Sequence, residues 1–133
     1  MSDIIDNIYR KKIGESLKQI GFVWMGSSFI NTKSPVIKEI SLEKYRWNTS
    51  TRKQFWFNLS LFLPTKDYHV FSIKDWNLYY TMVFRKNIGY CWGDENFMYS
   101  IEEGKNPENV TQDIETHMND IIIPVLSTLD STE

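Results

Sequence analysis

Residues 54–63, Gln-Phe-Trp-Phe-Asn-Leu-Ser-Leu-Phe-Leu, decide the fold of this chain. Successive side chains of a strand point to opposite faces of a sheet, so this segment has one wholly apolar face and one mixed face. The apolar face carries Phe55, Phe57, Leu59, Leu61 and Leu63. The mixed face carries Gln54, Trp56, Asn58, Ser60 and Phe62. This pattern is typical of a strand inside a sheet with one face against the core, so we predict that these residues form the central strand.

An amphipathic helix is predicted on each side of the strands. Apolar residues recur every three or four positions in residues 5–20 and again in residues 110–129. Gly21 suits the end of the first helix because glycine tolerates a left-handed backbone. Pro107 suits the start of the second, where the first turn leaves amide hydrogens unpaired in any case. We expect Pro124 to kink the second helix or to end its regular part.

Further strands are predicted in residues 22–30, 36–42, 78–84 and 96–101, the first of them interrupted by a turn at Gly26. Residues 65–77 give the weakest pattern, with a short helix or strand near His69. The order of helix, strands and helix predicts an α+β fold, in which an antiparallel sheet of about five strands carries an N-terminal and a C-terminal helix on one face. A chain of 133 residues is expected to form one domain, spanning residues 1–133.

The second face of this sheet has no assigned cover. Trp56 and Phe62 point there from the central strand, and we expect Trp24 to join them. Either the C-terminal segment covers this face, or its aromatic side chains form a surface for a second copy of the chain, a ligand or a partner. The sequence leaves these alternatives open.

Charge is distributed unevenly along the chain, although the formal net charge is only −2. Residues 1–90 hold 14 basic and 7 acidic residues, whereas residues 91–133 hold 1 basic and 10 acidic residues. Either an acidic C-terminal helix balances basic N-terminal elements, or one acidic face is presented to a basic partner. A nucleic-acid partner is disfavoured by a pI near 5.7, although basic and aromatic residues alternate in residues 44–56.

The cellular location is read from what the sequence lacks. Cys91 is the single cysteine, so the chain forms no internal disulfide, which fits a reducing compartment. The N-terminal residues lack the positive charge and apolar run of a secretory signal, and no stretch approaches the roughly 18 consecutive apolar residues of a membrane span. We therefore expect a cytoplasmic protein with no membrane contact.

No residues have the spacing of a catalytic, metal-binding or phosphate-binding motif, so we assign no catalytic residue, no metal and no cofactor. His117 lies on the apolar stripe of the second helix, which favours a structural histidine over a base. His69 has no metal-binding neighbour at a suitable spacing. Cys91 has no charged neighbour that would lower its pKa, and is interpreted as a small buried hydrophobe.

Several short segments resemble a known family, the bacterial domain of unknown function 4304. These segments are residues 17–22, 28–30, 55–59, 85–89 and 113–126. Within residues 85–89 the recurring Arg-Ile-Gly of the family is interrupted by Lys86 and Asn87. The resemblance implies no activity, because the family is named for lacking one, and it draws attention to a single polar residue, Asn58.

Two hypotheses for function follow. In the first, the protein is a non-enzymatic module that binds another macromolecule through its acidic C-terminal third or its second sheet face, for example as an immunity-type inhibitor of a toxin with a basic active site. The partner-binding residues would be Asp94, Glu95, Glu102, Glu103, Glu108, Asp113 and Glu115. In the second, the protein is a small-ligand binder or an enzyme with a pocket at the aromatic face, near Trp24, Trp56 and Asn58.

Overall fold

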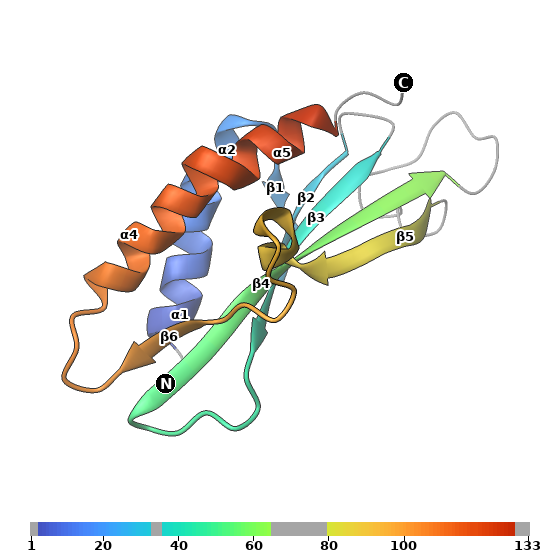
Figure 1. Ribbon diagram of the computed structural model, residues 1–133. Coiled ribbons are helices and arrows are strands. Elements are labelled where there is room, and N and C mark those ends of the chain that lie inside the picture. Colours follow the sequence, from blue (N-terminus) through green and yellow to red (C-terminus); the bar gives the residue numbers. More distant parts are fainter. Residues whose placement is uncertain (1–2, 33–35, 65–79, 130–133) are drawn as a thin grey trace.

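One antiparallel sheet carries both helical segments on the same face (Figure 1). The computed structural model describes residues 3–32, 36–64 and 80–129. The strands are β1 (Val23–Trp24), β2 (Ser28–Asn31), β3 (Ile37–Lys44), β4 (Arg52–Pro64), β5 (Tyr80–Asn87) and β6 (Tyr99–Glu102). The helical elements are α1 (Asp3–Asn7), η1 (Ile8–Ile13), α2 (Gly14–Gln19), η3 (Ile88–Trp92), α4 (Glu108–His117), η4 (Met118–Ile122) and α5 (Ile123–Thr128). The predicted α+β architecture is confirmed.

Strand β4 is the centre of the sheet, as the alternating pattern of residues 54–63 predicts. The order of strands is β1-β2-β3-β4-β5, and β6 also pairs with β4. One edge of β4 is paired with β3 along most of its length. The other edge is shared, because Arg52 to Phe55 pair with β6 and Asn58 to Pro64 pair with β5. Between these two pairings lie Trp56 and Phe57, and this interruption positions the candidate site described below.

The main core lies between the sheet and the helices. Phe55, Phe57 and Leu59 point into it from β4, as expected for the apolar face of the central strand. From the helices it receives Ile5, Ile8, Tyr9, Ile13, Leu17, Ile114, Met118, Ile122 and Leu126. Burial of side chains of this size is the largest favourable contribution to the stability of a small domain. A second buried cluster, made by Ile30, Ile37 and Phe62, lies on the opposite face of the sheet.

The N-terminal helix is continuous through α1, η1 and α2 and ends where the sequence predicts. The amide of Phe22 donates to the carbonyl oxygen of Leu17 at 3.0 Å, and the amide of Gly21 donates to that of Lys18 at 3.2 Å. This pair of bonds is a Schellman ending, which requires the positive φ of 102° that Gly21 adopts. Its middle part, η1, is a π-helix.

The C-terminal helix continues past Pro124. The side chain of Asn106 accepts a hydrogen bond from the amide of Glu108 at 3.0 Å, which starts the helix. A π-helical turn, η4, ends at Ile122, just before the proline. Because proline cannot donate to the carbonyl four residues earlier and its ring crowds that carbonyl, a widened turn lets the helix pass it. The expected interruption is therefore a local change of helical pitch.

Some sequence expectations are corrected. The fifth predicted strand is shorter than residues 96–101 indicate, and η3, a 3-10 helix, was not predicted. Trp24 pairs with Phe29 across β1 and β2 and contacts Tyr9 in the helix-facing core, so its expected position beside Trp56 on the second face is wrong. The short element expected near His69 lies outside the described residues. None of the helices in the described ranges is long and apolar enough to cross a bilayer.

Candidate functional site

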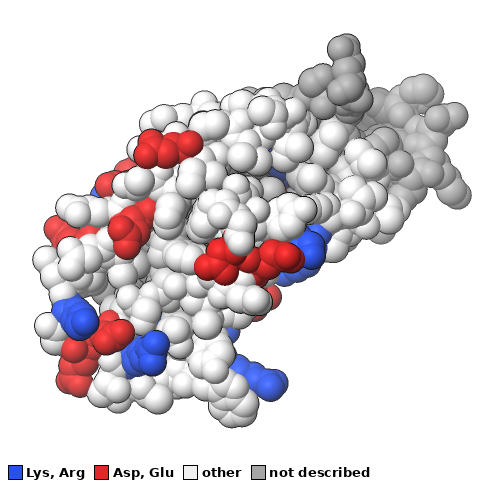
Figure 2. All heavy atoms as spheres, in the orientation of Figure 1, with Lys and Arg blue, Asp and Glu red and all other residues white. Residues whose placement is uncertain are grey.

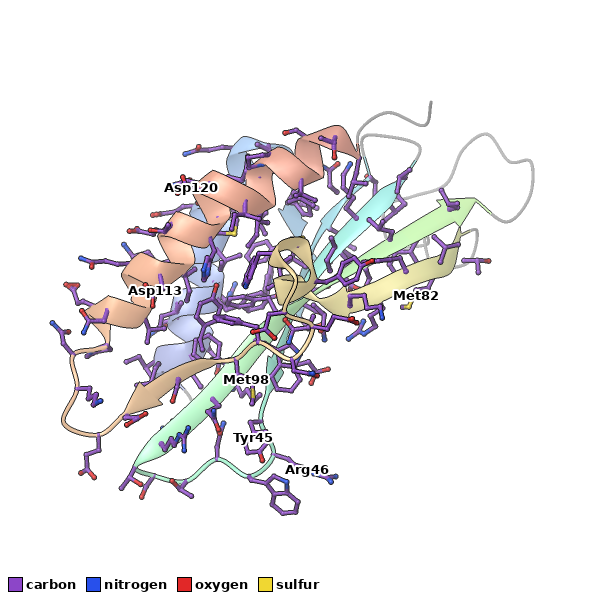
Figure 3. All side chains as sticks on the ribbon, viewed as in Figure 1. Tyr45, Arg46, Met82, Met98, Asp113 and Asp120 are labelled. Carbon is purple, nitrogen blue, oxygen red and sulfur yellow. The ribbon has the colours of Figure 1, made fainter. Side chains whose placement is uncertain are left out.

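A pocket of about 410 Å³ opens on the face of the sheet opposite the helices. Its lining residues are Glu43, Tyr45, Trp56, Asn58, Asn87, Glu95, Asn96 and Met98. Figure 3 shows Tyr45 and Met98 on the side of β4 that faces away from the helices. The volume falls within the range of about 300–1,000 Å³ that is usual for ligand sites.

The pocket forms where the edge of β4 passes from β6 to β5. At this point the chain leaves β5 through η3 and returns through residues 93–98 before β6 begins. The side chain of Asn87 holds both ends of this connecting segment. It accepts a hydrogen bond from the amide of Gly89 at 2.8 Å and donates one to the carbonyl of Phe97 at 2.7 Å. The returning segment supplies Glu95, Asn96 and Met98 as one wall.

The floor is built from Trp56 and Asn58 of β4. The indole Nε1 of Trp56 donates to Oδ1 of Asn58 at 3.1 Å, which fixes both the tilt of the ring and the orientation of the amide. Asn58 is only 8% exposed, and no hydrogen bond to its Nδ2 is found within the part of the chain that the structure describes. Ser41, its cross-strand partner on β3, has a buried hydroxyl that also lacks a partner among the described residues. Buried polar groups normally have partners, so the hydroxyl of Ser41 is an exception beside the floor.

The opposite wall is made by β3 and the residue that follows it. Glu43 is the cross-strand neighbour of Trp56, and the chain continues into Tyr45. The guanidinium of Arg85 lies 3.6 Å from Oε1 of Glu43 and 4.0 Å from Oε1 of Glu39, and donates to the hydroxyl of Ser60 at 3.2 Å. The contact with Glu43 is longer than a hydrogen bond and half-exposed, so it leaves that carboxylate available.

Glu95 is held more tightly than Glu43. Its carboxylate accepts a hydrogen bond of 2.9 Å from the ammonium of Lys86. This hydrogen bond, and the negative charge of Glu95, raise the pKa of Lys86 above its ordinary value. Lys86 and Arg85 lie outside the lining set, so within the described part of the chain the charged groups that line the pocket are the two carboxylates of Glu43 and Glu95.

The structure brings together two of the three residues named for a ligand site. Trp56 and Asn58 meet at the pocket floor, whereas Trp24 stacks under the guanidinium of Arg10 at 4.4 Å, beside the N-terminal helix. Whether these residues bind a ligand stays a prediction. Sequence reasoning missed Glu43, Tyr45, Asn87, Asn96 and Met98 as lining residues. The alternation of β3 places Glu43 on the second face, but it does not give the register with Trp56 that makes them neighbours.

The acidic residues named for a partner site occupy three separate elements. Asp94 and Glu95 lie in the loop after η3, Glu102 and Glu103 lie at the end of β6, and Glu108, Asp113 and Glu115 lie on α4. On the face drawn in Figure 2, uncharged and basic atoms separate the acidic side chains. Glu115 pairs with Lys12 at 3.4 Å, and Glu95 pairs with Lys86. Their role towards a partner stays a prediction.

His117 and Cys91 lie near the aromatic end of the core. A hydrogen bond of 2.7 Å joins Nδ1 of His117 to the hydroxyl oxygen of Tyr99, and the imidazole stacks on Trp92 with ring centres 4.3 Å apart. Cys91 is partly buried, and burial raises the pKa of its thiol, which disfavours the reactive thiolate. Both environments are those of packed structural residues.

Comparison with known proteins places the chain in a family without a known activity. Residues 13–128 match the sequence model of a family described as a domain of unknown function (DUF4304). No curated protein and no solved structure is significantly similar to the chain. Any function must therefore be argued from the site itself.

Proposed function

Because the chain belongs to the DUF4304 family of domains of unknown function, whose membership assigns no activity, we propose a function from the pocket on the second sheet face. We infer that the protein is a non-enzymatic binding module, and that this pocket receives a small, flat, polar ligand or a group of that kind on a larger partner. The observation that carries the proposal is the floor, where Asn58 lines the cavity beside Trp56 and its Nδ2 donates to no residue within the described ranges.

The ion pairs and residue types of the pocket lining favour binding over catalysis. Both carboxylates that line the pocket lie against cations of the chain itself, Glu43 against Arg85 and Glu95 against Lys86. Among the described residues that line the pocket there is neither a serine, threonine or cysteine nucleophile nor a histidine base. Groups of this kind position a ligand through hydrogen bonds and stacking without reacting with it.

A thermal-unfolding screen tests the proposal. Nucleotides, sugars, amino acids and arginine-containing peptides are added separately to the full chain and to its Asn58→Leu variant, with Thr116→Ala as a control on the exposed side of α4. A ligand at roughly a hundredfold excess over its Kd adds about 2.7 kcal/mol to the free energy of unfolding. We expect at least one compound to stabilise the full chain and the control variant but not Asn58→Leu. Equal stabilisation of all three proteins, or of none, would contradict ligand binding at this pocket.

A second candidate is the immunity-type interaction with a basic protein, which the acidic outer side of α4 supports. Glu108, Asp113 and Glu115 are exposed there, and a basic active site is complementary to such a surface. We propose for this candidate, as for the first, a bacterial cytoplasmic setting. Charge reversal at Glu108 and Asp113 is expected to abolish co-purification of a partner from native lysate, whereas Asn58→Leu leaves it unchanged. If Asn58→Leu abolishes co-purification and the charge reversal does not, the partner binds at the pocket and this candidate is wrong.

A further inference from the structure

The polar groups of the pocket define the complementary pattern of a ligand. Asn58 offers at the floor an Nδ2 amino group that donates to none of the residues described, and Glu43 offers carboxylate oxygens beside it. The two residues lie on neighbouring strands, because Asn58 pairs with Ser41 and Glu43 pairs with Trp56 in the same register. Diagonal neighbours of an antiparallel pair are about 7–8 Å apart, so one small ring system can reach both. A ligand that contacts both residues must therefore carry an acceptor that faces Asn58 and, next to it on the same edge, donors that face Glu43.

The hydrophobic part of the pocket favours a planar ligand. The hydrogen bond to Asn58 holds the indole of Trp56 in the floor, while Tyr45 and Met98 approach from opposite walls. Nucleobases stack on aromatic side chains and are read by hydrogen bonds along their edges. Guanine presents a carbonyl acceptor next to two adjacent N–H donors. Adenine, cytosine and uracil do not present that order, and only two adjacent donors engage both oxygens of one carboxylate.

A second hollow lies on the helix-facing side of the sheet and does not extend the first, although Tyr45 lines both. It has a volume of about 570 Å³ and is lined by Ile5 of the N-terminal helix and by Lys44 and Lys53, which share the face of Phe55. The ammonium of Lys44 lies 3.1 Å from the carboxylate of Asp6. The ligand of the first pocket is therefore argued from its base alone.

From these arrangements we propose that the pocket binds the base of a guanine nucleotide. Asn58 Nδ2 donates to O6, and the Glu43 carboxylate accepts from N1–H and the N2 amino group. This inference rests on the proposed function and specifies its ligand. The same chemistry is carried by a free mononucleotide and by an unpaired guanine in single-stranded RNA.

Isothermal titration of the full chain with GMP, AMP, CMP and UMP tests the assignment of the base. We expect GMP to bind at least about tenfold more tightly than the other three, since the loss of one good edge contact is worth that factor or more. Glu43→Gln should weaken GMP binding about tenfold or more. Glu39→Gln is the matched control, because Glu39 also pairs with Arg85 on the same face but does not line the pocket. Glu39→Gln should leave the affinity within about twofold.

A separate titration distinguishes the possible sources of the guanine. Guanosine should bind about as tightly as GMP, because the contacts of the pocket are made to the base. A five-nucleotide RNA with one guanine that binds more tightly than GMP assigns the site to RNA, and the reverse assigns it to the mononucleotide. Equal binding of all four nucleotides, or a Glu43→Gln variant with unchanged affinity, overturns the guanine assignment. If GMP fails while another compound from the screen binds through Asn58, the proposed function stands and this inference falls.

Discussion

Gly89 has no room for a side chain. A Cβ built at this position would lie 2.2 Å from the carbonyl oxygen of Asp94 and 2.6 Å from Cβ of Phe97. Neither atom is at the end of a flexible side chain, so the segment after η3 would have to move. We expect Gly89→Ala to lower the free energy of unfolding by about 1–3 kcal/mol, measured by urea denaturation. Glu103→Gln, on an exposed side chain nearby in the sequence, should change it by less than about 0.5 kcal/mol.

Two buried tyrosines predict how stability depends on alkaline pH. Burial, aided by the Glu39 carboxylate, raises the pKa of Tyr9 far above its ordinary value, and burial with Asp113 does the same for Tyr99. The folded state therefore keeps protons that the unfolded state releases above pH of about 10. The contribution of both phenols is fully present below that pH and is lost as pH rises from there towards their folded pKa values.

The measurement is urea denaturation at pH 8 and at pH values above 10. Replacing Tyr9 and Tyr99 by phenylalanine should flatten the loss of stability at alkaline pH. Tyr9→Phe also removes the hydroxyl that donates to the carbonyl of Ile40 at 2.8 Å, so we expect it to cost about 1 kcal/mol at pH 8. Tyr90→Phe, at an exposed position, is the control. An unchanged slope in the double variant would contradict the assignment.

Sequence reasoning found the floor of the candidate site but not its walls. Trp56 and Asn58 were recognised because the period of an isolated strand shows which side chains share a face. Trp24 was misplaced because the turn at Gly26 separates a strand of only two residues, too short for a pattern to give its orientation. Met98 belongs to the wall through a loop whose path depends on tertiary hydrogen bonds of Asn87, which no local pattern reports.

At the scale of elements, the two faces of β4 should respond differently to the same substitution. Phe57 is almost fully buried between the sheet and the helices, whereas its neighbour Trp56 is half-buried at the pocket. Phe57→Ala leaves a cavity in the core, and we expect it to cost about 3–5 kcal/mol. Trp56→Ala is the matched control and should cost about 0.5–2 kcal/mol. Chemical denaturation gives both values, and similar costs would show that the second face contributes to the core as much as the first.

The larger elements could be predicted from the sequence, and their irregularities could not. The apolar stripes and the terminal signals at Gly21 and Asn106 are local, so both helices were placed closely. The π-helical turns of η1 and η4 are shifts of hydrogen bonding that leave the stripe nearly unchanged. Strands β5 and β6 share one edge of β4, and this pairing depends on contacts between residues that are far apart in the sequence. That sharing is what creates the pocket.

At the scale of the whole molecule, folding places the basic and acidic parts of the chain against one another. Lys12 on the N-terminal helix pairs with Glu115 on the C-terminal helix at 3.4 Å, and Lys86 pairs with Glu95. Basic residues dominate the first 90 positions and acidic residues dominate the rest, so each pair joins the basic part to the acidic part, across 103 residues for Lys12–Glu115 and across 9 for Lys86–Glu95. These contacts partly even out the surface, as the first interpretation of the charge distribution expects, while α4 keeps exposed carboxylates.

This pairing between the helices predicts a weak dependence of stability on salt. Both side chains of the Lys12–Glu115 pair are nearly half exposed, 46% and 49%, so water screens their attraction. A double-mutant cycle with Lys12→Gln and Glu115→Gln should give a coupling energy of about 0.2–1 kcal/mol at low salt. Since the Debye length falls from about 10 Å at 0.1 M to about 3 Å at 1 M, that coupling should shrink at 1 M NaCl. A coupling well above 1 kcal/mol that salt does not reduce would mean that the helices depend on this ion pair, rather than on the apolar stripe beneath it, for their association.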